Sequence, residues 1–153
     1  MNIQELTQIE KSVFVKAPRS RVWKALTDSK EFAKWFHVKT SDSFQPGSRV
    51  NLVSTYPGHE GEAFFFDVDE VTPETRFAWR WNPGGKEAGL PVPDDPMTRV
   101  VFDLEEVDGG TLVKVTESGF DRISLVRRAA AFEGNSQGWT IQMQNIRNYV
   151  EAA

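Results

Sequence analysis

The chain has 153 residues, of which 39% are hydrophobic and 26% charged, the balance of a globular domain large enough to close one hydrophobic core. Its 18 Lys and Arg against 22 Asp and Glu give a net charge of -4, whereas nucleic-acid-binding domains normally carry a basic excess. No apolar run approaches the roughly 20 residues that cross a bilayer. We therefore expect a single domain over residues 1–153, with no nucleic-acid partner and no membrane span.

The first residues are polar. The segment Met1–Lys11 contains Gln4, Glu5, Gln8 and Glu10 where a signal peptide would be apolar, and the chain has no cysteine for disulfides. We expect the protein to be cytoplasmic.

The first third of the chain predicts one strand followed by two short helices. Alternating apolar residues predict a strand over Ile9–Val15, and helical spacing of apolar residues predicts a helix over Arg19–Thr27. Asp28 and Glu31 have the spacing of a capping box, in which each side chain accepts from the other's backbone N–H, so a second helix is expected over Ser29–Phe36.

The middle of the chain predicts antiparallel strands joined by turns. Alternation and Gly or Pro turn signals predict strands over Arg49–Ser54, Glu62–Val71, Arg76–Trp81, Thr98–Glu106 and Thr111–Ser118. The irregular stretch Asn82–Met97 is rich in Pro and Gly, and loops of this length are often functional, so it is a candidate lid.

The end of the chain predicts a long helix. Asp121–Glu133 allows a partial helix, which Gly134-Asn135 is expected to interrupt. From Ser136 as N-cap to Ala152 the pattern is helical, and one narrow stripe carries Trp139, Met143, Ile146 and Val150. The order of elements predicts an α+β fold.

The order of particular residues also resembles a known superfamily. The matching set is Ala17-Pro18 followed by Val22-Trp23, Leu26-Thr27-Asp28, Trp35, Pro46-Gly47, Glu70-Val71 with Pro73 before Phe77 and Trp81, Gly110-Thr111 before Val113, Gly119-Phe120, and Gly138-Trp139. With this set the chain resembles the START-like, or SRPBCC, superfamily, in the branch related to the activator of the 90-kDa heat-shock protein ATPase. The resemblance implies a helix-grip fold: a curved antiparallel sheet wraps around the long C-terminal helix, two short helices follow strand one, and an apolar cavity lies between sheet and helix.

Relatives in this superfamily bind lipids, sterols or polyketides, so the resemblance implies binding of a small hydrophobic or aromatic ligand without a cofactor. The candidate lining residues are mostly large apolar side chains: Trp35, Phe64, Phe66, Trp79, Trp81, Phe102, Trp139, Gln142, Met143 and Ile146. If these side chains meet and fill the space, the same residues form only a packed core. Gln142, Asn145, Arg80 and Arg99 are candidates for a polar anchor.

A second hypothesis is a cofactor-free enzyme of the cyclase or dehydratase kind in the same cavity. His37 is its candidate general base, because imidazole exchanges protons near neutral pH. Asp67 and Asp69 resemble a carboxylate pair, although alternate positions on an exposed strand face explain them without chemistry. With two His and no Cys, the sequence predicts no metal site.

A third hypothesis is a protein-interaction module that is linked to a chaperone or forms a homodimer. The eukaryotic activator carries an additional N-terminal domain with no counterpart among these 153 residues, which weakens the expectation of a chaperone partner. An exposed apolar patch in place of a pocket would favour this third hypothesis.

Overall fold

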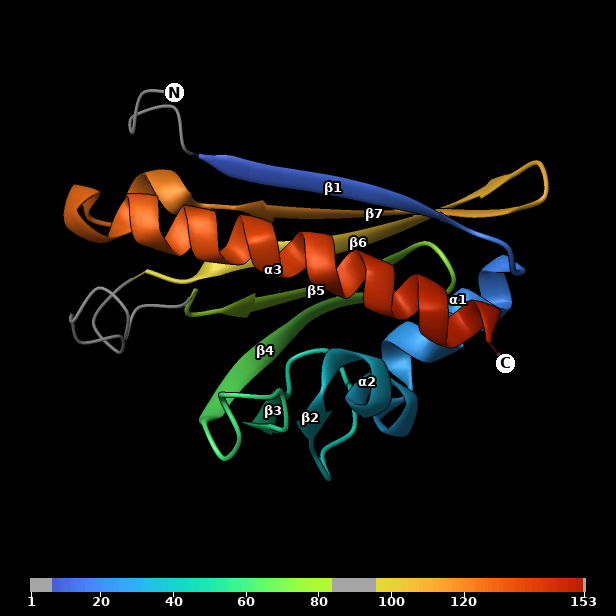
Figure 1. Ribbon diagram of the computed structural model, residues 1–153, viewed down its shortest axis with the longest axis horizontal. Helices are drawn as coiled ribbons and strands as arrows, with labels where there is room; N and C mark the ends of the chain where they lie inside the picture. The colour runs from blue at the N-terminus through green and yellow to red at the C-terminus, as the bar shows by residue number, and fades with distance from the viewer. Residues whose placement is uncertain (1–6, 84–95, 153) are drawn as a thin grey trace.

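The computed structural model describes residues 7–83 and 96–152, and it has the predicted α+β helix-grip architecture (Figure 1). One antiparallel sheet of seven strands has the order β1-β7-β6-β5-β4-β3-β2. The strands are β1 (Gln8–Val15), β2 (Val38–Lys39), β3 (Arg49–Ser54), β4 (Ala63–Thr72), β5 (Arg76–Trp81), β6 (Thr98–Val107) and β7 (Gly110–Ser118). The helices are α1 (Arg19–Thr27), α2 (Ser29–Phe36) and α3 (Leu125–Glu151), with a 3-10 turn, η3, at Phe120–Arg122. Figure 1 shows α3 lying along one face of the sheet, with its C-terminal end beside α1.

Helices α1 and α2 have the predicted bounds, and Asp28 separates them. Its backbone N–H donates to Lys24 at the end of α1, while its carboxylate accepts from two backbone N–H groups of α2 at 3.0 and 3.2 Å. The other half of the predicted capping box, in which the Glu31 side chain accepts from the Asp28 backbone N–H, is wrong. Glu31 instead accepts from Arg21 Nη1 at 2.7 Å and from Tyr149 Oη at 3.2 Å, because these partners from α1 and α3 offer a stronger, charge-assisted contact.

The predicted strands are confirmed within one or two residues, and one short strand, β2, was not predicted. In β5, Phe77 and Trp79 are buried while Arg76 and Arg80 on alternate positions are exposed. The register of β4 against β5 shifts between Val68 and Glu70, and such an irregularity bends a strand. Of the predicted lid 82–97, residues 84–95 lie outside the described residues.

Helix α3 is longer than predicted. It is continuous from Leu125 to Glu151, so the expected interruption at Gly134-Asn135 and the expected N-cap at Ser136 are wrong. A glycine inside a helix lowers the stability of the helix by only about 1 kcal/mol relative to alanine. Tertiary packing of the helical residues before and after the glycine offsets this loss. The predicted stripe is confirmed, because its members Trp139, Met143, Ile146 and Val150 are all buried.

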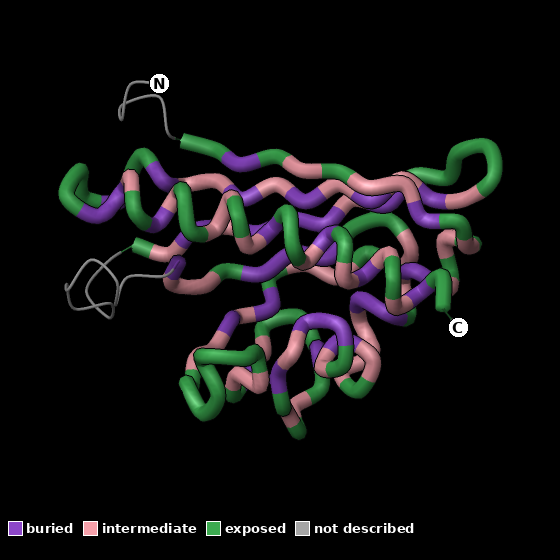
Figure 2. The backbone as a smooth tube through the Cα atoms, viewed as in Figure 1, coloured by how far each residue is buried: buried purple, intermediate pink, exposed green. Residues whose placement is uncertain are grey.

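Aromatic rings fill much of the space between the sheet and α3. Trp79 is completely buried, and its ring stacks on Phe66 with 4.3 Å between centroids. The Phe102 ring lies 5.3 Å and the Trp139 ring 6.2 Å from Trp79, so strands and helix meet at one aromatic cluster. Figure 2 shows buried segments alternating with exposed ones along the strands and α3. The interior around Trp79 is therefore packed core.

Candidate functional site

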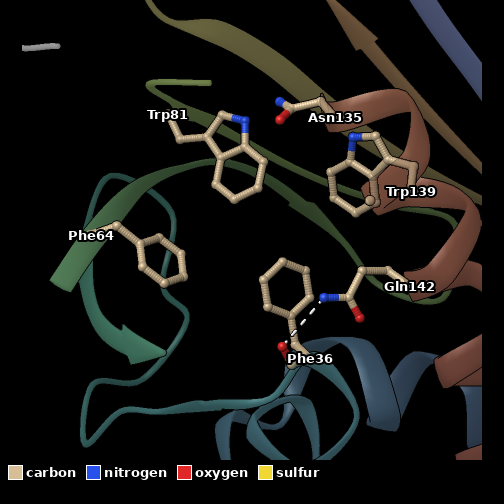
Figure 3. Close-up of a pocket in the computed structure, with 7 residues that line it drawn as sticks. Phe36, Phe64, Trp81, Asn135, Trp139 and Gln142 are labelled. Carbon is tan, nitrogen blue, oxygen red and sulfur yellow. Dashed lines mark hydrogen bonds between the residues drawn. The ribbon is translucent and has the colours of Figure 1, made fainter. Parts of the chain in front are cut away.

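A pocket of about 210 Å³ opens between α3 and the strands β4 and β5 (Figure 3). Seven described residues from four elements line it: Phe36 from α2, Phe64 from β4, Trp81 from β5, and Asn135, Gly138, Trp139 and Gln142 from α3. Phe64, Trp81 and the polar residues of α3 are only half-buried, so the pocket can be reached from solvent.

Four aromatic rings form the walls of this pocket. The centroids of Trp81 and Trp139 are 5.8 Å apart with a 33° angle between the rings, and Phe36 lies 6.4 and 6.2 Å from them. Phe64 extends the wall, 6.3 Å from Trp81. A Cβ atom added at Gly138 would meet nothing within 4 Å, so the missing side chain leaves open space on this part of α3. The arrangement offers flat apolar surfaces to a ligand.

The amide of Gln142 is held on both sides. Its Nε2 donates to the Phe36 carbonyl at 3.3 Å, and its Oε1 accepts from Asn145 Nδ2 at 3.1 Å. Asn145, a predicted polar anchor, thus contacts the lining residue rather than the pocket. Arg80 and Arg99, the other two predicted anchors, pair with Asp69 on the sheet, at 3.7 and 2.7 Å.

Behind the pocket wall lies a buried carboxylate, Glu117 of β7, with no exposed surface. Trp139 Nε1 donates to its Oε1 at 2.8 Å, and Trp81 Nε1 donates to its Oε2 at 2.9 Å. Thr98 Oγ1 donates at 2.6 Å, and Asn135 Nδ2 lies 3.0 Å from both oxygens. The carboxylate therefore joins β5, β6, β7 and α3 and fixes three pocket residues.

Glu117 was not identified from the sequence, although a signal for it exists. Inward-facing positions of β7 alternate through Thr111, Val113, Val115 and Glu117, and each is buried. A carboxylate in that register breaks the apolar pattern, and a buried carboxylate needs several donors. Phe36, Asn135 and Gly138 were likewise not named as lining residues, because they face the pocket only through tertiary packing.

The ten candidate lining residues fall into two groups. Phe64, Trp81, Trp139 and Gln142 line the pocket. The other six are buried in the core: Trp35, Phe66, Trp79, Phe102, Met143 and Ile146. Trp35 lies on the side of α2 that faces α1, where its Nε1 donates to the Ala25 carbonyl at 2.7 Å.

His37, the candidate general base, is the C-cap of α2 in the left-handed conformation (φ 60°). Its ring lies edge-on to Tyr56, with 5.7 Å between centroids, and it is not among the lining residues given above. Asp67 makes a two-bond ion pair with Arg49 at 2.8 and 3.1 Å. The pKa of Asp69 is held below its ordinary value, chiefly by the hydrogen bond from Arg99. Both carboxylates therefore serve cross-strand ion pairs.

Within residues 7–83 and 96–152, no three His, Asp or Glu side chains gather in a group that could hold a metal ion. None of the helices there is long and apolar enough to cross a membrane.

The fold is that of a helix-grip protein. Residues 16–151 match the family model described as activator of Hsp90 ATPase homolog 1-like protein, and the chain belongs to this family. No curated protein matches the sequence.

Solved structures show the same fold at low sequence identity. A protein from Mesorhizobium loti has 21% identity and a TM-score of 0.76, with 95% of this chain and 98% of that chain covered. A protein from Arthrobacter aurescens has 14% identity and a TM-score of 0.78, covering 100% and 90%. The Aha1 dimer from Colwellia psychrerythraea has 20% identity and a TM-score of 0.70, covering 94% and 96%.

Proposed function

We propose that this chain, acting as one domain, binds a small aromatic molecule of one or two rings in the pocket between α3, β4 and β5. The observation that carries the proposal is the lining: four aromatic rings around a space of about 210 Å³. Drug-sized ligands occupy pockets of roughly 300 to 1,000 Å³, whereas a cavity of about 150 Å³ accommodates benzene. The size thus favours a compact ring system over a sterol or a long acyl chain.

Binding is favoured over catalysis by the chemistry of the lining. The described lining residues contribute four aromatic rings, one glycine and two amides, and none of these seven residues has a side chain that titrates near neutral pH. Among the described residues, Glu117 is the buried carboxylate near the pocket, and four side chains donate hydrogen bonds to it. These groups can hold and orient a ligand, while general acid–base catalysis needs a proton carrier within hydrogen-bond reach of the ligand.

The test uses the indole N–H signals of Trp81 and Trp139 in a ¹H–¹⁵N NMR titration with 2-naphthol. We expect saturable shifts of these two signals among the five tryptophans of the chain. Gly138→Leu should abolish the saturable shifts, because its side chain would occupy the pocket. Gly134→Leu is the matched control on the same helix: a Cβ there also meets nothing within 4 Å, and Gly134 is exposed outside the pocket. Absent shifts in wild type, or full binding by Gly138→Leu, would refute the proposal.

Self-association is a second proposal, favoured by a separate observation. The related Colwellia psychrerythraea protein was solved as a dimer, and in this chain α3 begins with exposed Leu125 (51%) and Val126 (78%). We expect light scattering to give about twice the monomer mass of 17.3 kDa, and Val126→Glu to return the mass to that of a monomer. A monomeric wild type at high concentration would contradict this.

A chaperone ATPase as a partner rests on the family description alone. A direct ATPase assay with the purified chain tests it, and stimulation of the chaperone would support that role over ligand binding as the main function.

A further inference from the structure

Glu117 controls which polar groups the pocket presents. Both indole N–H groups of the pocket wall donate to Glu117, Trp81 Nε1 at 2.9 Å and Trp139 Nε1 at 2.8 Å. These are the donors that would otherwise bind an anionic ligand. In the close-up, both indole nitrogens lie at the end of the pocket where Asn135 enters from α3.

The same carboxylate fixes the orientation of the Asn135 amide. A carboxylate can only accept, so the Asn135 group that lies 3.0 Å from both Glu117 oxygens is the donor Nδ2. The acceptor Oδ1 then points away from Glu117. Among the described residues none donates a hydrogen bond to Asn135 Oδ1, and Asn135 is a lining residue. The pocket therefore offers an acceptor for a ligand's O–H or N–H group.

The charge of Glu117 also favours a neutral ligand over an anion. Glu117 is completely buried, and the side chains described as donating to it belong to Trp, Thr and Asn rather than to Lys, Arg or His. Its partners are neutral indole, hydroxyl and amide groups. A charge with little exposure to water acts strongly over short distances, so a ligand carboxylate on the other side of the indole wall would be repelled.

We propose that the ligand is a compact aromatic molecule bearing a neutral hydrogen-bond donor, such as a phenol or an aromatic N–H, and that Glu117 excludes aromatic and fatty acid anions. This inference rests on the proposed function and adds the ligand's polarity to it. Asn135 Oδ1 receives the ligand's donor, the rings of Trp81 and Trp139 contact its faces, and Glu117 acts as a positioning residue for all three.

Three probes of matched shape test the inference on the wild-type chain at neutral pH: naphthalene, 2-naphthol and 2-naphthoate. The readouts are calorimetric affinity and the indole N–H shifts. We expect 2-naphthol to bind about fivefold more tightly than naphthalene, the effect of one net hydrogen bond. The anion 2-naphthoate should bind most weakly of the three.

A pair of variants tests whether Asn135 causes the preference for 2-naphthol over naphthalene. Asn135→Ala should lower the affinity for 2-naphthol more than that for naphthalene, so that their ratio falls to about one. Asn148→Ala is the control: the same substitution at an exposed position of α3 outside the pocket should keep the ratio of wild type. Circular dichroism checks that both variants fold. The comparison of the three probes on the wild-type chain does not depend on either variant.

The outcomes separate this inference from the proposed function. If 2-naphthoate binds as tightly as 2-naphthol, or if Asn135→Ala keeps the preference for 2-naphthol, the inference on ligand polarity is overturned while pocket binding stands. If none of the three probes shifts the indole signals, the proposed function fails and the inference fails with it. The expected ranking of affinities, with 2-naphthol binding most tightly and 2-naphthoate most weakly, supports both the proposed function and the inference on ligand polarity.

Discussion

Trp139 on α3 donates its indole N–H to Glu117 on β7, with 2.8 Å between Nε1 and Oε1. The bond fixes the rotation of the long helix against the sheet, because Trp139 also belongs to the aromatic cluster around Trp79. One carboxylate thus contributes both to the core and to the shape of the pocket.

The first prediction concerns the stability that Glu117 provides. Glu117→Ala leaves two indole N–H groups, the Thr98 hydroxyl and the Asn135 amide without their acceptor. Since each unpaired buried donor is costly, we expect the free energy of unfolding to fall by roughly 3 to 5 kcal/mol. Urea denaturation measures the change. Glu105→Ala, at an exposed position of β6, should cost less than about 0.5 kcal/mol; equal effects of the two substitutions would contradict the role of Glu117.

The second prediction concerns two fully buried tryptophans. Trp35 Nε1 donates to the Ala25 carbonyl at 2.7 Å and so joins α2 to α1, whereas Trp79 Nε1 has no hydrogen-bond partner within the described part of the chain. Trp35→Phe and Trp79→Phe remove similar volumes, so the difference isolates the hydrogen bond. We expect Trp35→Phe to be more destabilising by about 1 to 3 kcal/mol. Thermal and urea unfolding of both variants check this, and a larger loss for Trp79→Phe would show that packing outweighs the bond.

The third prediction concerns the two glycines inside α3. Added Cβ atoms at Gly134 and Gly138 meet nothing within 4 Å, so alanine fits without a clash. Each Gly→Ala substitution should raise the free energy of unfolding by about 1 kcal/mol, the difference in helix propensity. Chemical denaturation of the single and double variants tests the effect. If the helix were interrupted at Gly134-Asn135 in solution, Gly134→Ala would bring no gain or a loss.

The fourth prediction concerns pH. The hydrogen bond from Arg99 Nε to Asp69 Oδ2, at 2.7 Å, lowers the pKa of Asp69 in the folded chain. A lowered folded-state pKa contributes stability that is complete above the ordinary Asp value of about 3.9 and is lost as pH falls through the folded-state value. Because the pair is on the surface, the contribution should stay below about 1 kcal/mol.

NMR titration of the Asp69 carboxyl carbon checks the direction of this shift. Arg99→Gln should move the midpoint upward, toward the ordinary value. Arg147→Gln removes a surface arginine that pairs instead with Glu151 on α3 and should leave the midpoint unchanged. A midpoint that does not respond to Arg99→Gln would show that the ion pair is not formed in solution.

Local patterns were enough to predict most of the elements. The bounds of α1 and α2 follow from side-chain spacing and from the Asp28 cap, which involve contacts within a few residues. The strands follow from alternation, as in β5, where Phe77 and Trp79 share the buried face. The family resemblance added the arrangement of these elements in space, which the family match to residues 16–151 supports.

The continuity of α3 and the identity of the pocket depended on contacts far apart in sequence. Gly134-Asn135 is a poor helix sequence by itself, yet Asn135 bonds to Glu117 on β7 and the helix continues. Likewise, the sequence alone specified that large aromatic residues face the interior. Only the tertiary structure decided that Trp79 is packed in the core while Trp81, two residues later on the same face, borders open space. The physical reason is that periodicity determines which face a side chain takes, whereas filled or empty volume depends on the neighbours that other elements bring to that face.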